Sequence, residues 1–262
     1  MTARKIKDGV YSVGAIDPDR RLFDELVPLP EGTTYNSYFV KGSKKTALFD
    51  TVDPAKEKVL FDNLKSLNID KIDYLIAHHA EQDHSGSIPA VLECHPETKV
   101  VTNQKCKGFL IDLLPINEDR FIVVKDRETI SLGDKTIEFI IAPWVHWPET
   151  MFSYIKEDKV LLTCDFFGSH LASSDVFVKS EDEVRMSAKR YYAEIMMPFR
   201  TSVKSHLETL KKYDIEIIGP SHGPVYQNPK FILEAYADWS SDKVKNEIVI
   251  PYVSMHGSTA KM

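Results

Sequence analysis

The sequence predicts an α/β fold in which two sheets pack face to face and helices cover their outer faces. Strands and helices are mixed in the first half of the chain, whereas the second half has a run of strands, then helices and one more strand. Two similar halves of this kind indicate two packed sheets with helices outside. No linker interrupts residues 1–240, so we expect this part of the chain to form one domain.

The first half begins with short β-branched or aromatic runs, which favour strands. These runs are VYSVGAI, YNSYFV and KTALFDT, and Gly42 with Ser43 between the last two predicts a hairpin. Asp53 and Pro54 fit the N-cap and the first position of a helix over residues 53–68. The apolar run IDYLIA then predicts a strand. The segments after it predict a short helix (SGSIPAVLECHP), a strand (TKVVTN) and a second helix (QKCKGFLIDLLP).

The second half begins with segments that all predict strands, because they are short and rich in β-branched and aromatic residues. In order they are FIVVKD, ETISL, KTIEFIIAP, MFSYIKE and KVLLTCD. Two helices are expected next, EDEVRMSAKRYYAEIMM and FRTSVKSHLETLKKY. The strand IEIIGPS and a helix around PKFILEAYADWSS complete the predicted order.

Composition excludes several classes of protein. The net charge of −6 and the pI near 5.9 argue against nucleic acid as a main partner, since phosphate binding needs clustered basic residues. No apolar stretch approaches the roughly 20 residues of a membrane-spanning helix, and no apolar run follows the early positive charges as in a signal peptide. The three cysteines show no pairing pattern. A cytoplasmic protein without a membrane span is therefore expected.

The segment IAHHAEQDHSGSIP, residues 76–89, concentrates metal-binding side chains at the end of a predicted strand. A sheet can hold such side chains rigidly while the loop leaves them reachable. His79, Glu81, Asp83 and His84 alternate or adjoin in sequence, so they can converge on one or two ions from a single turn. The alternative interpretation is a polar loop with capping residues.

Three further residues of ligand type also follow predicted strands. They are His146 in IIAPWVHWPET, Asp165 in LLTCDFFGSH and His222 in IIGPSHGPVY. A single histidine in such a place is more often structural, but the repetition predicts a metal centre of four imidazoles and three carboxylates. Imidazole suits zinc and iron alike, whereas added carboxylates favour the harder, oxidisable metal.

With these residues the chain resembles the metallo-β-lactamase superfamily, whose motif His-x-His-x-Asp-His is followed by His, Asp and His at later strand ends. Glu81 replaces the second histidine, and the resulting His-x-Glu-x-Asp-His is similar to the flavodiiron proteins, which hold two irons. The segments GTTYNSYFV, DHSGSIP, HWPETMFSY, DFFGSH, RYYAEIMMPF and SHGPV also match this branch, so the resemblance covers residues 1 to about 250. It implies an αββα sandwich of two mixed sheets flanked by helices.

The resemblance also implies how the two irons are held. One would be bound by His79, Glu81 and His146, the other by Asp83, His84 and His222, with Asp165 bridging them. Zinc could replace iron in heterologous preparations, because affinity alone favours zinc over ferrous iron.

Several neighbouring residues are weaker candidates. Only one of the adjacent Tyr191 and Tyr192 should face the site. The resemblance favours Tyr191 as a hydrogen-bond donor to bound oxygen, although core packing explains either tyrosine equally well. His170 would orient a carboxylate or cap a loop. His78 is expected to be hydrogen-bonded elsewhere rather than to bind metal.

The last residues, EIVIPYVSMHGSTAKM, predict a strand and a loop that resembles the phosphate-binding loop of a flavodoxin. Flavodiiron proteins carry a C-terminal flavodoxin domain whose flavin delivers electrons to the irons. We therefore expect a diiron domain over residues 1–250 and, over residues 251–262, the vestigial or truncated start of a flavodoxin-like segment. No FMN is expected, because the helix that would hold its phosphate does not follow.

Three functions follow from these expectations. The first is a diiron sensor that binds O2 as a peroxo adduct, because two ferrous ions supply only half of the electrons that full O2 reduction needs. Such a sensor would signal to a cytoplasmic chemoreceptor or kinase, as in chemotaxis. The second is an O2 or NO reductase served by an external electron donor. The third is a zinc hydrolase, against which Glu81 argues. A homodimer is the default expectation in each case.

Overall fold

The computed structural model describes residues 2–23, 25–243 and 252–262. One sheet has seven strands in the order β1-β2-β7-β8-β9-β10-β11. Its strands from β1 to β8 pair antiparallel and those from β8 to β11 pair parallel, so the sheet is mixed. The bounds are β1 (Arg4–Lys7), β2 (Val10–Ser12), β7 (Tyr38–Lys41), β8 (Thr46–Phe49), β9 (Tyr74–Ile76), β10 (Lys99–Thr102) and β11 (Phe121–Val123).

The second sheet has five strands in the order β12-β13-β14-β15-β16. It is also mixed, because β15 and β16 pair parallel and the other pairs are antiparallel. The bounds are β12 (Thr129–Ser131), β13 (Thr136–Ile141), β14 (Met151–Ile155), β15 (Val160–Cys164) and β16 (Ile217–Pro220). Two small hairpin-like pairs lie outside these sheets: β3 (Ala15–Asp17) with β6 (Thr33–Tyr35), and β4 (Leu22–Phe23) with β5 (Val27–Pro28).

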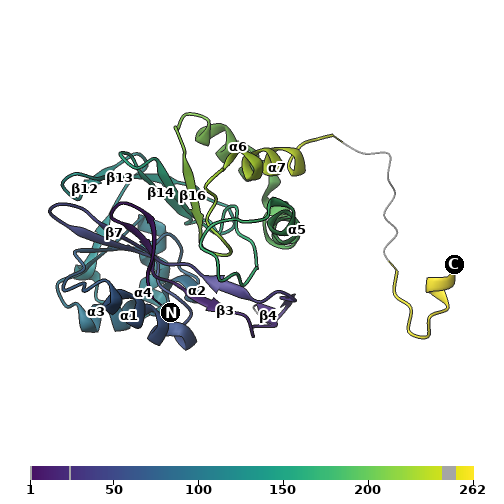
Figure 1. Cartoon of the computed structure of the whole chain (residues 1–262), viewed down its shortest axis with the longest axis horizontal. Helices are drawn as coiled ribbons and strands as arrows, with labels where there is room; N and C mark the ends of the chain where they lie inside the picture. Colours follow the sequence, from purple (N-terminus) through teal and green to yellow (C-terminus); the bar gives the residue numbers. More distant parts are fainter. Residues whose placement is uncertain (1, 24, 244–251) are drawn as a thin grey trace.

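Helices cover the outer face of each sheet, and this arrangement confirms the predicted αββα sandwich (Figure 1). One apolar cluster joins the seven-stranded sheet to its helices, a second joins the five-stranded sheet to its helices, and a third fills the space between the sheets. The helices on the first sheet include α1 (Glu57–Ser66), α3 (Ile88–Cys94) and α4 (Gln104–Leu113), whereas the short α2 (Gln82–Ser85) lies at an edge of the sandwich. Those on the second are α5 (Glu181–Tyr191), α6 (Arg200–Leu210) and α7 (Lys230–Trp239).

The structure confirms the sequence signals for a helix start and for a hairpin. The Asp53 side chain accepts a hydrogen bond from the Ala55 backbone N–H at 2.9 Å, and Pro54 begins the short 3-10 turn that leads into α1. The hairpin expected at Gly42 and Ser43 connects β7 to β8. Asn103 was not singled out in the sequence, yet it caps α4 by accepting from two backbone N–H groups.

Two predicted elements differ from the structure, and a third falls largely outside the described residues. The run VYSVGAI is two strands, since Ser12 pairs with β7 whereas Ala15 pairs with β6. Between them, a side chain on Gly14 would place its Cβ only 2.1 Å from the Tyr35 carbonyl oxygen. The helix expected over residues 181–197 is α-helical only to Tyr191 and continues as a π-helix over Tyr192–Met196. The strand expected near the C-terminus falls largely on residues 244–251, outside the described residues.

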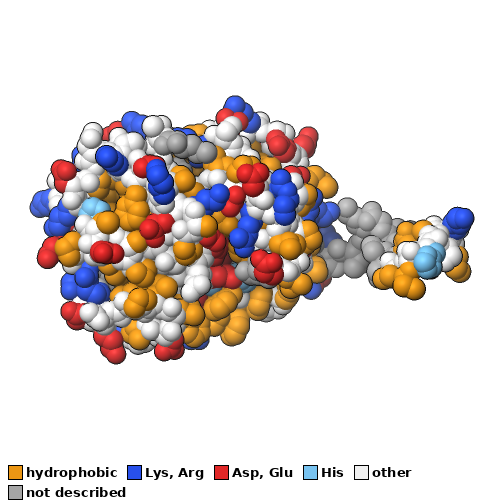
Figure 2. Space-filling model, turned by 90° about the horizontal axis from the view of Figure 1, so that it is seen from below, with side chains coloured by type: hydrophobic (Ala, Val, Ile, Leu, Met, Phe, Trp, Pro, Cys, Tyr) orange, Lys and Arg blue, Asp and Glu red, His pale blue; other side chains and the backbone are white. Residues whose placement is uncertain are grey.

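Charged side chains of both signs are interspersed over the face of the molecule shown in Figure 2. Within the described part of the chain, none of the helices combines the length and the apolar character that crossing a bilayer requires.

Candidate metal centre

The seven residues expected to bind metal converge at one edge of the sandwich, on loops that follow strands of both sheets. The loop after β9 and the short helix α2 supply four of them, and the connections around β13, β15 and β16 supply three. At this edge the sheets also touch directly, because the Met151 backbone N–H at the start of β14 donates to the His78 carbonyl oxygen. The four residues from the first sheet are His79, Glu81, Asp83 and His84, and the three from the second are His146, Asp165 and His222.

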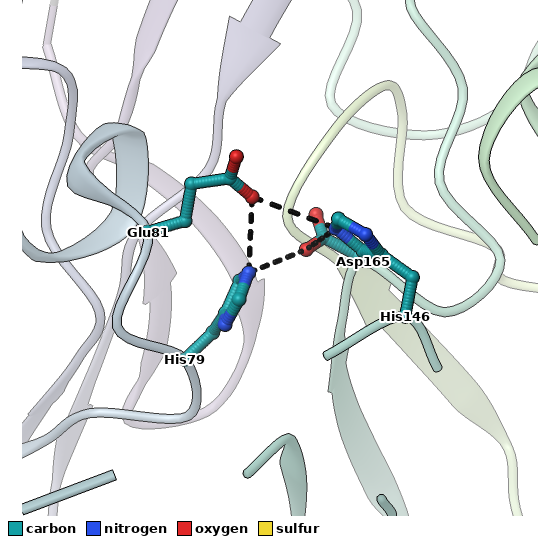
Figure 3. A group of neighbouring side chains, drawn as sticks. All are labelled: His79, Glu81, His146 and Asp165. Carbon is teal, nitrogen blue, oxygen red and sulfur yellow. Dashed lines mark hydrogen bonds and ion pairs between the residues drawn. The ribbon is translucent and has the colours of Figure 1, made fainter. Parts of the chain in front are cut away.

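One group within the cluster consists of His79, Glu81, His146 and Asp165, whose candidate ligand atoms all lie within 4.8 Å of one another (Figure 3). His79 Nε2 is 3.0 Å from Glu81 Oε2 and 3.7 Å from Asp165 Oδ2. His146 Nε2 is 3.5 Å from Glu81 Oε2 and 3.4 Å from Asp165 Oδ2. Two imidazoles and two carboxylates therefore point at one small volume.

A second group consists of Asp83, His84 and His222. His84 Nε2 is 3.3 Å from Asp83 Oδ1, and His222 Nε2 is 3.2 Å from Asp83 Oδ2. Both ring nitrogens also lie 3.2 Å from Asp165 Oδ1. Asp165 therefore turns one oxygen to each group, which is the arrangement of a carboxylate shared by two neighbouring cation positions.

The hydrogen bonds behind the rings show which nitrogen is free to bind a cation. His222 Nδ1 lies 2.6 Å from the Thr34 carbonyl oxygen, which can only accept, so Nδ1 carries a proton. In the neutral ring the lone pair of Nε2 then faces carboxylate oxygens. His84 Nε2, His222 Nε2, Asp165 Oδ1 and both Asp83 carboxylate oxygens are buried and have no hydrogen-bond partner among the described residues. Buried polar atoms normally have partners, so this donor set fits a pair of metal cations.

Without a metal ion, protons must balance the carboxylates, and the histidines are strongly basic. Burial by itself lowers the pKa of His222, but the carboxylates of Asp165 and Asp83, each 3.2 Å from Nε2, outweigh burial and raise the pKa to about 10. The pKa of His79 is likewise raised to about 10, against burial, by Glu149 and Glu81. For His84 and His146 the pKa is raised to about 9.

Asp165 has the opposite shift. Burial favours the neutral carboxyl group, yet the surrounding histidines hold the pKa of Asp165 well below its usual value. The cluster is thus a set of anionic oxygens that requires cations at ordinary pH.

Of the two adjacent tyrosines, Tyr191 lies against the cluster. Its ring centroid is 4.9 Å from that of His170 and 6.0 Å from that of His222, whereas the Tyr192 ring packs with Tyr236 and Trp239. Burial raises the pKa of Tyr191 well above its usual value, and the nearby Asp165 charge adds to this effect. Tyr191 is therefore a neutral hydroxyl at ordinary pH.

His170 and His78 lie beside the cluster but bond elsewhere. His170 Nδ1 is 2.9 Å from the Thr33 hydroxyl, and burial lowers the pKa of His170 to about 2, so its ring is neutral. His78 Nδ1 is 2.6 Å from Asp50 Oδ2, and its Nε2 is 2.8 Å from the Ser153 hydroxyl. His78 thus connects the two sheets behind the cluster.

Sequence reasoning missed Glu149. This buried residue places Oε1 at 2.6 Å from His79 Nδ1, on the opposite side of the ring from the cluster. Its signal was weak, because the only indication was a carboxylate three residues after His146 in the segment HWPET.

A pocket of about 370 Å³ reaches the cluster from outside and is lined by Glu81 and Asp83. Its other walls include the aromatic rings of Phe23, Tyr35 and Trp147. The remaining lining residues are Arg20, Asp53, Gln82 and Leu113, so a small molecule can approach the carboxylates through a pocket with both polar and aromatic walls.

Comparisons with known proteins agree with this geometry. The family model described as ODP family beta lactamase matches residues 33–223. A nitric oxide reductase of Moorella thermoacetica is 38% identical over 267 residues, which cover 98% of this chain and 66% of that protein. A flavo-diiron protein of Clostridium acetobutylicum is 36% identical over 269 residues, which cover 99% of this chain and 67% of that protein.

Among solved structures, the rubredoxin oxygen:oxidoreductase from Desulfovibrio gigas superposes with a TM-score of 0.94 at 35% identity. The match covers 99% of this chain and 67% of that chain. The chain thus spans about two thirds of the length of the curated relatives that it matches.

Proposed function

This chain belongs to the ODP family of β-lactamase-type proteins, with flavodiiron proteins among its relatives, and we propose that it is an oxidoreductase that reduces O2 or NO at two iron ions. The observation that carries this proposal is the placement of Asp165, whose two oxygens face two separate groups of histidines at 3.2–3.7 Å. A carboxylate that faces two groups of ligands fits a site for two metal ions better than a site for one.

We assign one metal position to His79, Glu81 and His146 and the other to Asp83, His84 and His222, with Asp165 between them. Carboxylates make up three of the seven ligands, which suits iron better than an all-histidine set would. Two ferrous ions bound there would supply electrons to O2 or NO. The protein's own contribution is to hold the ligands on loops anchored by two sheets.

Residues around the pocket complete the proposed site. The ring of Tyr191 lies 6.0 Å from that of His222, and we assign to its neutral hydroxyl the donation of a hydrogen bond at this side of the site. Phe23 and Trp147 form apolar parts of the pocket wall beside Glu81 and Asp83.

An external donor is proposed as the source of electrons. The name of the Desulfovibrio gigas protein includes rubredoxin and oxygen, and that of the Moorella thermoacetica protein includes nitric oxide. These names support a reductase over the oxygen sensor expected first from the sequence. Sensing and a chemoreceptor partner stay predictions without support from the relatives.

The test is steady-state turnover. Protein loaded anaerobically with ferrous iron should contain two irons per chain and consume O2 or NO when reduced rubredoxin or a reduced flavoprotein is supplied. Negligible consumption of both gases, together with a long-lived visible absorption band after one exposure to air, would favour sensing and refute the reductase. Two zinc ions in protein grown with added iron, together with thioester or lactam hydrolysis, would instead support a zinc hydrolase.

A homodimer is part of the same proposal, because most soluble oligomers of this kind are symmetric pairs. Light scattering coupled to gel filtration should give twice the chain mass of 29.9 kDa.

A further inference from the structure

We propose that Glu149 makes the two metal positions unequal: acting through His79, it strengthens metal binding at the position of His79, Glu81 and His146 only. This inference rests on the metal pair of the proposed function. Glu149 is a positioning residue in it, because it touches a ligand rather than a reacting molecule.

Glu149 is held in place from several sides. It immediately precedes Thr150 at the start of the β14 region and is only 1% exposed. Its Oε1 lies 2.6 Å from His79 Nδ1 and 3.2 Å from the Ala80 backbone N–H. The side-chain amide of Asn103 donates to the Glu149 carbonyl oxygen at 2.6 Å, which fixes the backbone of the loop. The carboxylate therefore has little freedom to turn away from His79.

This contact determines what the other side of the His79 ring can do. A carboxylate that accepts the Nδ1 proton fixes the tautomer, so the Nε2 lone pair faces Glu81 and Asp165. It also makes the imidazole a more basic ligand, because the developing positive charge on the ring is shared with an anion. Oε2 of Glu149 is buried without a hydrogen-bond partner among the described residues, so no neighbouring donor there offsets its charge.

The other ligand histidines lack this support. The Nδ1 of His222 contacts the neutral carbonyl group of Thr34 at 2.6 Å. Within the described ranges, the ion pairs that His84 and His146 form with carboxylates involve Nε2 only. The position of His79 is therefore adjoined by Glu81, Glu149 and one oxygen of Asp165, whereas the other position is adjoined by Asp83 and the second oxygen of Asp165.

Because more carboxylates adjoin one metal position than the other, the two positions should bind metal in a fixed order. The first divalent ion should occupy the His79 position, and the second should enter the position of His84 and His222. Loss of an outer partner of a ligand histidine typically weakens metal binding about 10- to 100-fold, so E149Q should weaken one of the two binding steps by that factor.

The experiment uses the full chain, stripped of metal and titrated with Zn²⁺ against a chromophoric chelator. Wild type should bind two ions in two resolved steps, and E149Q should bind the tighter one about 10- to 100-fold more weakly with the weaker step unchanged. NMR of the protein labelled with ¹⁵N-histidine identifies the position: the first equivalent of Zn²⁺ should shift the His79 and His146 signals in wild type, and this preference should disappear in E149Q.

D158N is the matched control. It also removes a buried carboxylate, here one paired with Lys135 at 2.5 Å, but it lies in the turn between β14 and β15 at the end of these strands remote from the cluster. Its two Zn²⁺ affinities should equal those of wild type.

Two results would overturn the inference: E149Q affinities equal to those of wild type, or an equal loss at both steps. If E149Q does not fold, proton NMR of zinc-loaded wild type provides the test. The Nδ1 proton of His79 should appear strongly downfield, and absence of this signal would count against the hydrogen bond between His79 and Glu149. Zinc binding does not depend on turnover. A protein that fills its positions in this order yet reduces neither O2 nor NO would refute the proposed function and leave the role of Glu149 intact.

Discussion

Metal binding should expel nearly four protons from each chain at pH 8. In the metal-free cluster, the four ligand histidines have pKa values raised to about 9 or about 10, so they are charged at that pH. A metal ion takes the place of the Nε2 proton on each ring. Adding two equivalents of Zn²⁺ to the metal-free protein therefore replaces protons with metal ions.

The magnitude follows from these pKa values. At pH 8 the four rings together carry about 3.8 exchangeable protons, whereas four histidines of ordinary pKa, about 6.5, would carry about 0.1. Between pH 7 and pH 8 the release from the cluster should stay almost constant. Ordinary histidines would instead show a release that falls from about 1 proton to about 0.1.

The assay is a titration in weak buffer with a pH indicator, or calorimetry in two buffers of different ionisation enthalpy. Replacement of His206 should not change the count, because its Nε2 contacts the Pro143 carbonyl oxygen rather than a carboxylate of the cluster. Release of fewer than one proton per chain at pH 8 would refute the reasoning that carboxylates hold these histidines charged.

Four further outcomes are expected. D165N removes the charge that both histidine groups share, so elemental analysis should find at most one zinc per chain instead of two; two would contradict the bridging role. Y191F should keep both metals while kcat for O2 or NO falls at least about tenfold, and unchanged kcat would exclude the hydroxyl from proton donation. D50N weakens the bond to His78 and should lower the free energy of unfolding in urea by about 1–3 kcal/mol without changing the zinc count. Finally, raised histidine pKa values stabilise the metal-free fold below about pH 6.5, and this contribution is lost as pH rises through 9 to 10. Melting temperature should therefore fall over that range in metal-free protein and not in zinc-loaded protein.

Much of the geometry of the candidate centre was predictable because its proposed ligands are contiguous or follow strands. The spacing of His79, Glu81, Asp83 and His84 is a local property, and His222 follows a clear apolar run. The packed sheets were also predictable, since element order restricts how two sheets can stack.

Contacts between distant loops were not predictable from one sequence. Glu149 and His79 are 70 residues apart, and apart from its place three residues after His146 nothing near Glu149 distinguishes it from the other acidic residues. The split of VYSVGAI likewise depends on which strand each half meets, and a single β-forming run does not encode that choice. The π-helix over Tyr192–Met196 has no local signal, because the sequence after Tyr191 continues a helical pattern.

The cluster draws four side chains from one half of the sandwich and three from the other. Two bound metal ions would therefore connect the two halves. Ligands that bind only the folded state stabilise it by about 2.7 kcal/mol at a hundredfold excess over Kd. The lifetime of this protein in a cell would then depend on the iron supply, and chains made during iron shortage should be the first that proteases remove.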